Sequence, residues 1–157
     1  EAKEFSDTAV IVIARVGGEG TDLPTDLGAK DEEGNNLYTY TDNSTEYSDF
    51  ESGQHYLELS QTERNMVNIV CKNFDHVIVI CNSSNAMELG WVDEYKQIGS
   101  VISCPGAGET GFAALGKILN GEVNPSGKLA DTYVYDLTAT PAFNNFGDYF
   151  PTNCIVK

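Results

Sequence analysis

A single acidic residue, Glu19, lies in a glycine-rich segment, residues 17–20, that closely follows the apolar run of residues 9–14. A carboxyl group on a shaped loop can give or take a proton in a reaction. Glycine tolerates positive φ and lets other groups come close, so such a loop suits a ligand site. Glu19 would also serve as a solvated turn residue or a helix cap, and a lone glycine motif does not decide between these roles.

Three short apolar segments predict the strands that would position this loop. Residues 9–14 are rich in β-branched side chains and are closed by glycines, a pattern that predicts a strand buried on both faces. Residues 76–81 and 98–104 predict two more strands. Between the first two, the Ser-Gln-Thr-Glu sequence of residues 60–63 is a capping box that predicts the start of a helix. The chain therefore predicts a single α/β domain over residues 1–157, a flavodoxin-like three-layer sandwich with a mainly parallel sheet.

Two polar loops follow the second and third predicted strands. Residues 82–85 suit either the capping of a short helix over residues 87–95 or donation to a ligand. Residues 105–110 form a second glycine-rich loop ahead of another helix. That loop lacks the lysine of a phosphate-binding loop, and Glu109 would repel an anion, so we favour tight strand-to-helix packing over nucleotide binding. Loose alternation over residues 129–135 predicts a further strand.

Charge excludes two classes of partner. The formal net charge is −15 and the pI is about 4.2, which opposes binding to nucleic acid and to anionic membranes because both need basic residues. Residues 1–60 hold 14 acidic residues against 3 basic ones. Much of this excess lies in a long acidic loop, about 23–54. We expect that loop either to be solvated and mobile or to pack partly, through its tyrosines, against the protein or a ligand.

The four cysteines are not spaced as a zinc site: Cys71, Cys81, Cys104 and Cys154. Three of them lie within or beside apolar segments, where cysteine commonly acts as a small hydrophobic residue. We therefore expect free, buried thiols and a reducing compartment, which favours a cytoplasmic location. The sequence indicates no metal and no cofactor, and no apolar run approaches the roughly 20 residues of a membrane span.

Six segments of the chain resemble, in order, the α/β-sandwich domain of family 3 glycoside hydrolases, the β-glucosidase group. They are AVIVIAR with GGEGTD (residues 9–15 and 17–22), LS with ER (59–60 and 63–64), FDHVIVI (74–80), NAME with WVD (85–88 and 91–93), PG with GETG (105–106 and 108–111) and GEVNPSGKL (121–129). No single segment is specific, and the identification depends on all six occurring in the same order.

The resemblance implies a role for Glu19. In such enzymes a TIM-like barrel domain supplies an aspartate nucleophile, and the sandwich domain in many members supplies the general acid/base glutamate, which Glu19 matches. Arg15 and Asp22 flank it, and the resemblance gives them either sugar contact or orientation of the loop. A chain of 157 residues has no room for a barrel of about 250. We therefore expect a fragment that is inactive alone and that has two partners, a β-glucoside or oligosaccharide substrate and a barrel domain of the same parent protein.

Two other functions remain open from the sequence. A non-catalytic carbohydrate-binding or interaction module would use the acidic, tyrosine-bearing loop as its contact surface. A nucleotide-binding flavodoxin-like domain would carry flavin or nucleotide in the purified protein. Binding of glucose or cello-oligosaccharides by the isolated chain would indicate the first, and visible or near-ultraviolet cofactor absorbance would indicate the second.

Overall fold

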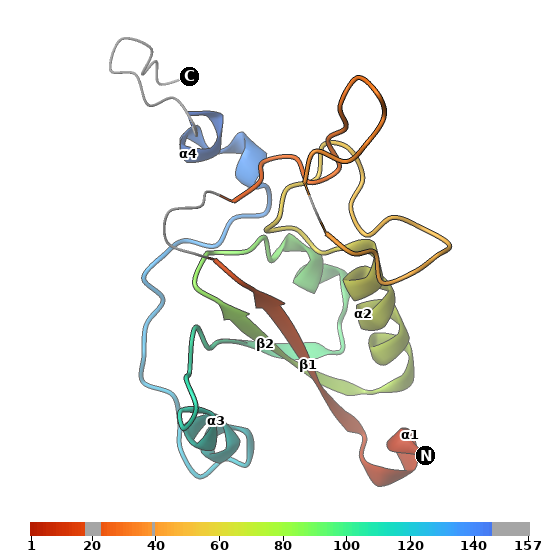
Figure 1. The fold of residues 1–157 in the computed structure, drawn as a ribbon. Helices are drawn as coiled ribbons and strands as arrows, with labels where there is room; N and C mark the ends of the chain where they lie inside the picture. The colour runs from red at the N-terminus through yellow and green to blue at the C-terminus, as the bar shows by residue number, and fades with distance from the viewer. Residues whose placement is uncertain (18–22, 39, 146–157) are drawn as a thin grey trace.

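A parallel sheet organises the computed structural model, which describes residues 1–17, 23–38 and 40–145. Three strands form this sheet within the described residues, in the order β1 (Thr8–Arg15), β2 (His76–Ser83) and β3 (Ile98–Ser103). Both pairs are parallel, and β1 and β2 stay in register from Thr8 opposite His76 to Arg15 opposite Ser83 (Figure 1). The α/β sandwich predicted from the sequence is thereby confirmed.

Helix α2 (Gln61–Asn73) connects β1 to β2 and begins at the predicted capping box. The Ser60 hydroxyl accepts from the Glu63 N–H at 3.2 Å, and the Glu63 carboxylate accepts from the Ser60 N–H at 2.8 Å. Both bonds satisfy amides that the first turn of a helix leaves without a partner. The helix then places Val67 and Cys71 against the sheet.

The hydrophobic core lies between α2 and the sheet. Its buried members are Ile11, Ile13, Leu59, Val67, Cys71, Val77, Val79, Cys81, Met87 and Trp91. Trp91 packs in this core, and its indole N–H donates to the Glu88 carbonyl at 3.0 Å. The core therefore fixes the strands at their centres and leaves their carboxyl ends free to carry loops.

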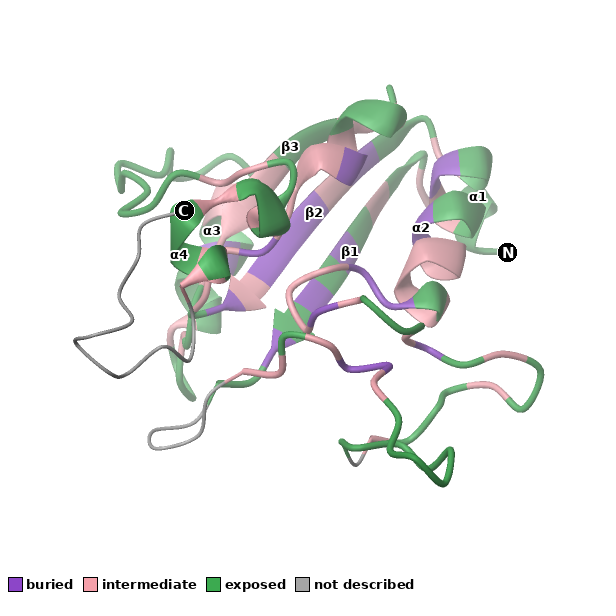
Figure 2. Ribbon diagram, turned by 90° about the horizontal axis from the view of Figure 1, so that it is seen from above, coloured by how far each residue is buried: buried purple, intermediate pink, exposed green. Residues whose placement is uncertain are grey.

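The remaining elements are short: α1 (Ala2–Phe5), η1 (Gly90–Glu94), α3 (Phe112–Leu119), η2 (Leu137–Ala139) and α4 (Pro141–Asn144). Figures 1 and 2 show α3 on the opposite side of the sheet from α2. The helix expected over residues 87–95 is confined to the 3₁₀ turn η1. No helix among the residues described is long and apolar enough to cross a membrane.

The prediction that the first strand is buried on both faces was wrong. Along β1 buried and accessible residues alternate (Figure 2), and Val10 and Val12 are 46% and 55% exposed. The physical reason is that β1 lies at the edge of the sheet, so its second face receives no covering layer from the described part of the chain. The apolar sequence is compatible with burial on that face but does not supply a covering element.

The strand expected over residues 129–135 is also absent, because this described segment is irregular. Side chains rather than a backbone ladder hold it beside the sheet. The Tyr133 and Ser103 hydroxyl oxygens are 3.3 Å apart, and the Tyr135 hydroxyl donates to Asp93 at 2.8 Å. Alternating side chains predict a strand only where a neighbouring strand offers its backbone groups.

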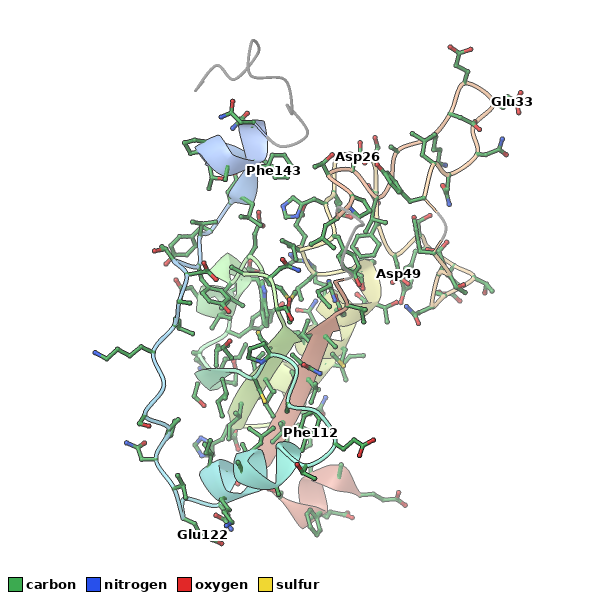
Figure 3. All side chains as sticks on the ribbon, turned by 60° about the vertical axis from the view of Figure 1, so that its left-hand side comes forward. Asp26, Glu33, Asp49, Phe112, Glu122 and Phe143 are labelled. Atoms are coloured by element: carbon green, nitrogen blue, oxygen red, sulfur yellow. The ribbon has the colours of Figure 1, made fainter. Side chains whose placement is uncertain are left out.

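The long acidic loop is partly packed, as one of the two alternatives predicted. Asp49 is 2% exposed and lies at the base of the loop, whereas Glu33 lies at its outer tip (Figure 3). The base is also closed by the Leu27 N–H, which donates to the Gln54 carbonyl at 2.7 Å. The loop thus has a solvated tip and a base that is anchored to the domain.

Candidate functional site

The structure describes the stem of the predicted catalytic loop and not its tip. Glu19 and Asp22 belong to residues 18–22, which lie outside the described residues. Arg15 is the last residue of β1, and Val16 and Gly17 carry the chain out of the sheet. The roles predicted for Glu19 and Asp22 therefore stay predictions. The geometry that follows is that of Arg15, Val16 and Gly17, which form the stem of the loop.

Arg15 is 7% exposed, and its guanidinium is surrounded by acceptors. The five bonds are Nε to the Tyr56 carbonyl (2.6 Å), Nη1 to the Ala14 carbonyl (2.8 Å) and to Glu63 Oε1 (2.6 Å), and Nη2 to the Glu58 carbonyl (2.6 Å) and to Glu63 Oε2 (2.5 Å). A guanidinium has five N–H donors, so every donor of Arg15 is engaged within the domain. Sugar contact by Arg15 stays a prediction, and this geometry favours its alternative, orientation of the loop.

Tyr56 contacts the loop stem directly. Its hydroxyl accepts from the Val16 N–H at 3.2 Å, and the Arg15 guanidinium carbon lies 5.3 Å from the centre of its ring. The sequence offers no signal for this role, since Tyr56 is 40 residues from Val16 along the chain and follows an irregular loop. Only the fold brings the two together.

The loops that leave β1, β2 and β3 meet at the carboxyl edge of the sheet, as expected for parallel strands. A Cβ atom added to Gly17 would lie 3.0 Å from the Asn85 side-chain nitrogen, and Asn82 accepts from the Gly106 N–H at 3.3 Å. Ser83 closes its own turn by donating to the Asn85 carbonyl at 2.8 Å. Of the two roles predicted for residues 82–85, the capping of the next helix was wrong, because η1 begins later, with Leu89 at its N-cap and no side-chain cap bond. Donation to a ligand stays a prediction.

Residues 1–154 match the C-terminal domain of glycosyl hydrolase family 3. The chain belongs to this family. It is 35% identical over 161 residues to Beta-glucosidase A of Butyrivibrio fibrisolvens, a match that covers 95% of this chain and 18% of that protein. Over 145 residues it is 30% identical to a Beta-glucosidase of Ruminococcus albus, covering 92% of this chain and 12% of the relative.

A solved structure agrees with the sequence relatives. The crystal structure of a beta-glucosidase from Paenibacillus barengoltzii superposes with a TM-score of 0.67 at 28% identity, over 93% of this chain and 13% of that chain. The chain spans 18% and 12% of the length of the two curated relatives that it matches.

A second buried cluster joins the segment after the acidic loop of the family 3 domain to the C-terminal helices η2 and α4. His55 is 2% exposed; its Nδ1 accepts from the Leu57 N–H at 3.2 Å, so the neutral ring carries its proton on Nε2 and donates to Glu88 at 3.0 Å. The same Glu88 oxygen accepts from the Leu137 N–H at 2.6 Å. The Phe143 ring lies 5.3 Å from the His55 ring. Sequence analysis missed this cluster because its members lie far apart along the chain.

Asp49 fastens the same loop to the start of α2. Its carboxylate accepts from the Asn43 N–H at 2.7 Å, from the Asn43 side-chain amide at 2.6 Å and from the Thr62 N–H at 3.1 Å. Burial raises the pKa of Asp49, but the hydrogen bonds from Thr62 and Asn43 outweigh it, so the pKa lies below its ordinary value of 3.8. A charged carboxylate at this position also complements the positive end of the helix.

Three cysteines of the family 3 domain lie within the described residues. Cys71, Cys81 and Cys104 are free, and the first two are buried, as predicted; Cys154 lies outside the described residues. Burial raises the pKa of the Cys81 thiol to about 11, so it is protonated and unreactive at neutral pH. Within the described residues no three His, Cys, Asp or Glu side chains are grouped so as to hold a metal ion.

Proposed function

We propose that this domain supplies the general acid/base carboxyl, Glu19, to a retaining β-glucosidase that hydrolyses terminal β-D-glucosyl residues. The observation that carries the proposal is the match to the family 3 domain together with the position of the loop stem. Gly17 leaves β1 at the carboxyl edge and lies against the loop that follows β2. Ligands of open α/β sheets bind at this edge. The relatives with this domain are named beta-glucosidases.

Retaining hydrolysis needs two carboxyl groups about 5–5.5 Å apart, one to protonate the leaving oxygen and one to attack the sugar. We assign the first role to Glu19 and the second to an aspartate of a barrel domain in the same parent protein. An acid that stays protonated near neutral pH needs burial or a nearby negative charge. A barrel docked over the carboxyl edge would supply both, and the isolated domain is expected to be inactive.

Leaving-group dependence in the full-length protein tests the acid role. Glu19→Gln should lower kcat/KM on alkyl β-glucosides by about 10²–10⁴-fold, the usual contribution of a general acid. The loss on 2,4-dinitrophenyl β-glucoside should be much smaller in the glycosylation step, because that leaving group departs without a proton. Glu33→Gln, at the exposed tip of the acidic loop, is the matched control and should change neither rate. Equal losses on both substrates would contradict the proposal.

The deglycosylation half of the reaction gives an independent readout. In Glu19→Ala, azide should accelerate turnover of the dinitrophenyl substrate and yield β-glucosyl azide, since azide attacks without giving up a proton. An α product, or no acceleration, would contradict a base role for Glu19 in a retaining enzyme.

The isolated chain tests the shared site. We expect it neither to hydrolyse a chromogenic β-glucoside nor to bind glucose or cello-oligosaccharides measurably, because half of the site belongs to the barrel. Turnover by the isolated chain that Glu19→Gln abolishes would overturn the division of labour. Tight binding without turnover would favour a carbohydrate-binding module instead.

A further inference from the structure

The stem of the Glu19 loop is held by a hydrogen bond from the backbone N–H of Val16, and not by packing of the Val16 side chain. Val16 follows the last paired residue of β1, and its side chain is 80% exposed. Its N–H therefore has no ladder partner on β2, and it donates instead to the Tyr56 hydroxyl at 3.2 Å. On the other side, Gly17 lies close to Asn85, since a Cβ atom added to it would lie 3.0 Å from the Asn85 side-chain nitrogen.

We infer that Tyr56 is a positioning residue for the loop that carries Glu19, and that it acts through the Val16 N–H. The inference rests on the proposed function of Glu19. Tyr56 touches neither substrate nor reacting atoms in this assignment; it sets the direction in which the chain leaves the sheet, three residues before the proton donor.

Tyr56 is itself held at two points by Arg15. The Arg15 Nε–H donates to the Tyr56 carbonyl at 2.6 Å, while the guanidinium lies over the Tyr56 ring. The ring and the backbone of Tyr56 are thus fixed relative to the end of β1. The hydroxyl that reaches Val16 is therefore carried by a residue that Arg15 contacts through both its ring and its backbone carbonyl.

Glu63 completes the support by linking Arg15 to α2. Its carboxylate binds both terminal nitrogens of Arg15 and also accepts from the Ser60 N–H at the start of the helix. The pair is largely buried, with side-chain exposures of 5% and 19%. The end of β1, the start of α2 and the segment that precedes α2 therefore form one unit, from which the Tyr56 hydroxyl reaches the loop stem.

Such support matters because proton transfer depends steeply on position: a misplacement of about 1 Å can cost roughly 10²-fold in rate. Removal of the hydroxyl alone, in Tyr56→Phe, keeps the ring and its contact with Arg15. It leaves the Val16 N–H, in an exposed stretch, to bond with water. The domain should therefore stay folded while the loop stem becomes less well directed.

The experiment compares Tyr56→Phe with Tyr47→Phe in the full-length enzyme. Tyr47 belongs to the acidic loop that precedes Tyr56, and its hydroxyl lies 3.3 Å from the Thr62 hydroxyl rather than at the stem of the Glu19 loop. We expect Tyr56→Phe to lower kcat/KM on alkyl β-glucosides by about tenfold, a part of what a general acid contributes. The kcat/KM of Tyr56→Phe on 2,4-dinitrophenyl β-glucoside should stay at that of the parent enzyme. Tyr47→Phe should keep the parental kcat/KM on both substrates. The ratio of the two rates in one sample does not depend on how much of the enzyme is folded.

Glu19→Gln, measured beside these variants, separates the two ideas. Suppose that Glu19→Gln loses more kcat/KM on alkyl than on dinitrophenyl β-glucosides, while Tyr56→Phe keeps the parental ratio of the two values. This result would overturn the positioning role and leave the proposed function standing. No leaving-group dependence in Glu19→Gln would overturn the proposed function, and the positioning role with it. A matching but smaller dependence in Tyr56→Phe supports both.

Discussion

Arg15 and Glu63 form a two-point ion pair that ties the end of β1 to the first turn of α2, with Nη1 2.6 Å from Oε1 and Nη2 2.5 Å from Oε2. The pair does more than join two elements. Glu63 also closes the capping box, and Arg15 also holds the backbone at Tyr56 and Glu58, in the segment that joins the acidic loop to α2. Three segments that the sheet topology alone would leave independent are therefore coupled through two side chains.

Loss of this pair should destabilise the domain strongly. Glu63→Gln leaves the Arg15 charge buried with no counter-charge, which typically costs about 3–5 kcal/mol. Urea unfolding followed by the fluorescence of Trp91 would measure it, since Trp91 is the only tryptophan and belongs to the core. The control is Glu94→Gln, because Glu94 and Arg64 form an exposed pair at 3.7 Å of the kind that contributes about 0–1 kcal/mol. Equal midpoints for the two variants would contradict the coupling.

Asp49 should make stability depend on pH in the acid range. Its pKa lies below the ordinary 3.8 in the folded protein, so the unfolded chain takes up the proton first. The stabilisation is then fully present above the ordinary pKa and is lost as the pH falls through it toward the folded value. Asp49→Asn should cost about 1–3 kcal/mol at pH 7, the usual cost of losing a buried acceptor.

Urea unfolding at a series of pH values checks this prediction. The difference between the parent protein and Asp49→Asn should be constant from pH 7 to about 5 and should shrink below about 4. Glu46→Gln, an exposed acid of the same loop, should run parallel to the parent protein throughout. A difference that grows toward acid would reverse the sign of the linkage and rule out this account of Asp49.

Glu88 should keep the C-terminal helices η2 and α4 folded against the domain. One of its oxygens accepts from both His55 and the Leu137 N–H, so Glu88→Ala removes the bond to the first residue of η2 and the 3.0 Å partner of the buried His55 ring. Hydrogen exchange followed by mass spectrometry should then show lost protection in residues 137–145 and around His55. Asp93→Ala, which removes only the exposed bond from Tyr135, should leave that protection in place.

Local signals in the sequence predicted the parts of the fold that are decided locally. Ser60 and Glu63 are three residues apart, and the helix begins where their capping box indicates. The apolar runs likewise predicted three parallel strands and hence the edge at which the loops meet. Exposure of Val12 was not predictable in this way, because burial of a second face depends on what lies over it.

The candidate site was predictable only where it follows from chain order. Arg15 lies at the end of a strand, so its place at the carboxyl edge follows from the pattern, whereas its engagement with Glu63 does not. Tyr56 and His55 were missed because each acts on a residue at least 30 positions away. No spacing rule connects such residues, and only packing decides which side chains reach them.

Cys81 should resist alkylation in the folded protein. Its pKa of about 11 leaves roughly one thiolate in 10³ at pH 8, and burial blocks access to it. A short pulse of iodoacetamide followed by peptide mapping should label the half-buried Cys104 well before Cys81, and the two should react alike in urea. Faster labelling of Cys81 in the native state would show that the core opens near β2.

Two glycines of the α3 region should respond in opposite directions to the same change. A Cβ at Gly111 would lie 2.2 Å from the Ala107 carbonyl oxygen, a contact with backbone that no side-chain rotation relieves, so Gly111→Ala should cost about 1–3 kcal/mol. At Gly116 an added Cβ meets nothing within 4 Å, and the position is exposed inside the helix. Gly116→Ala should therefore stabilise the domain by about 0.5–1 kcal/mol. Urea midpoints that move apart in this way would confirm that the tight turn between β3 and α3 needs a glycine at Gly111, and equal shifts would contradict it.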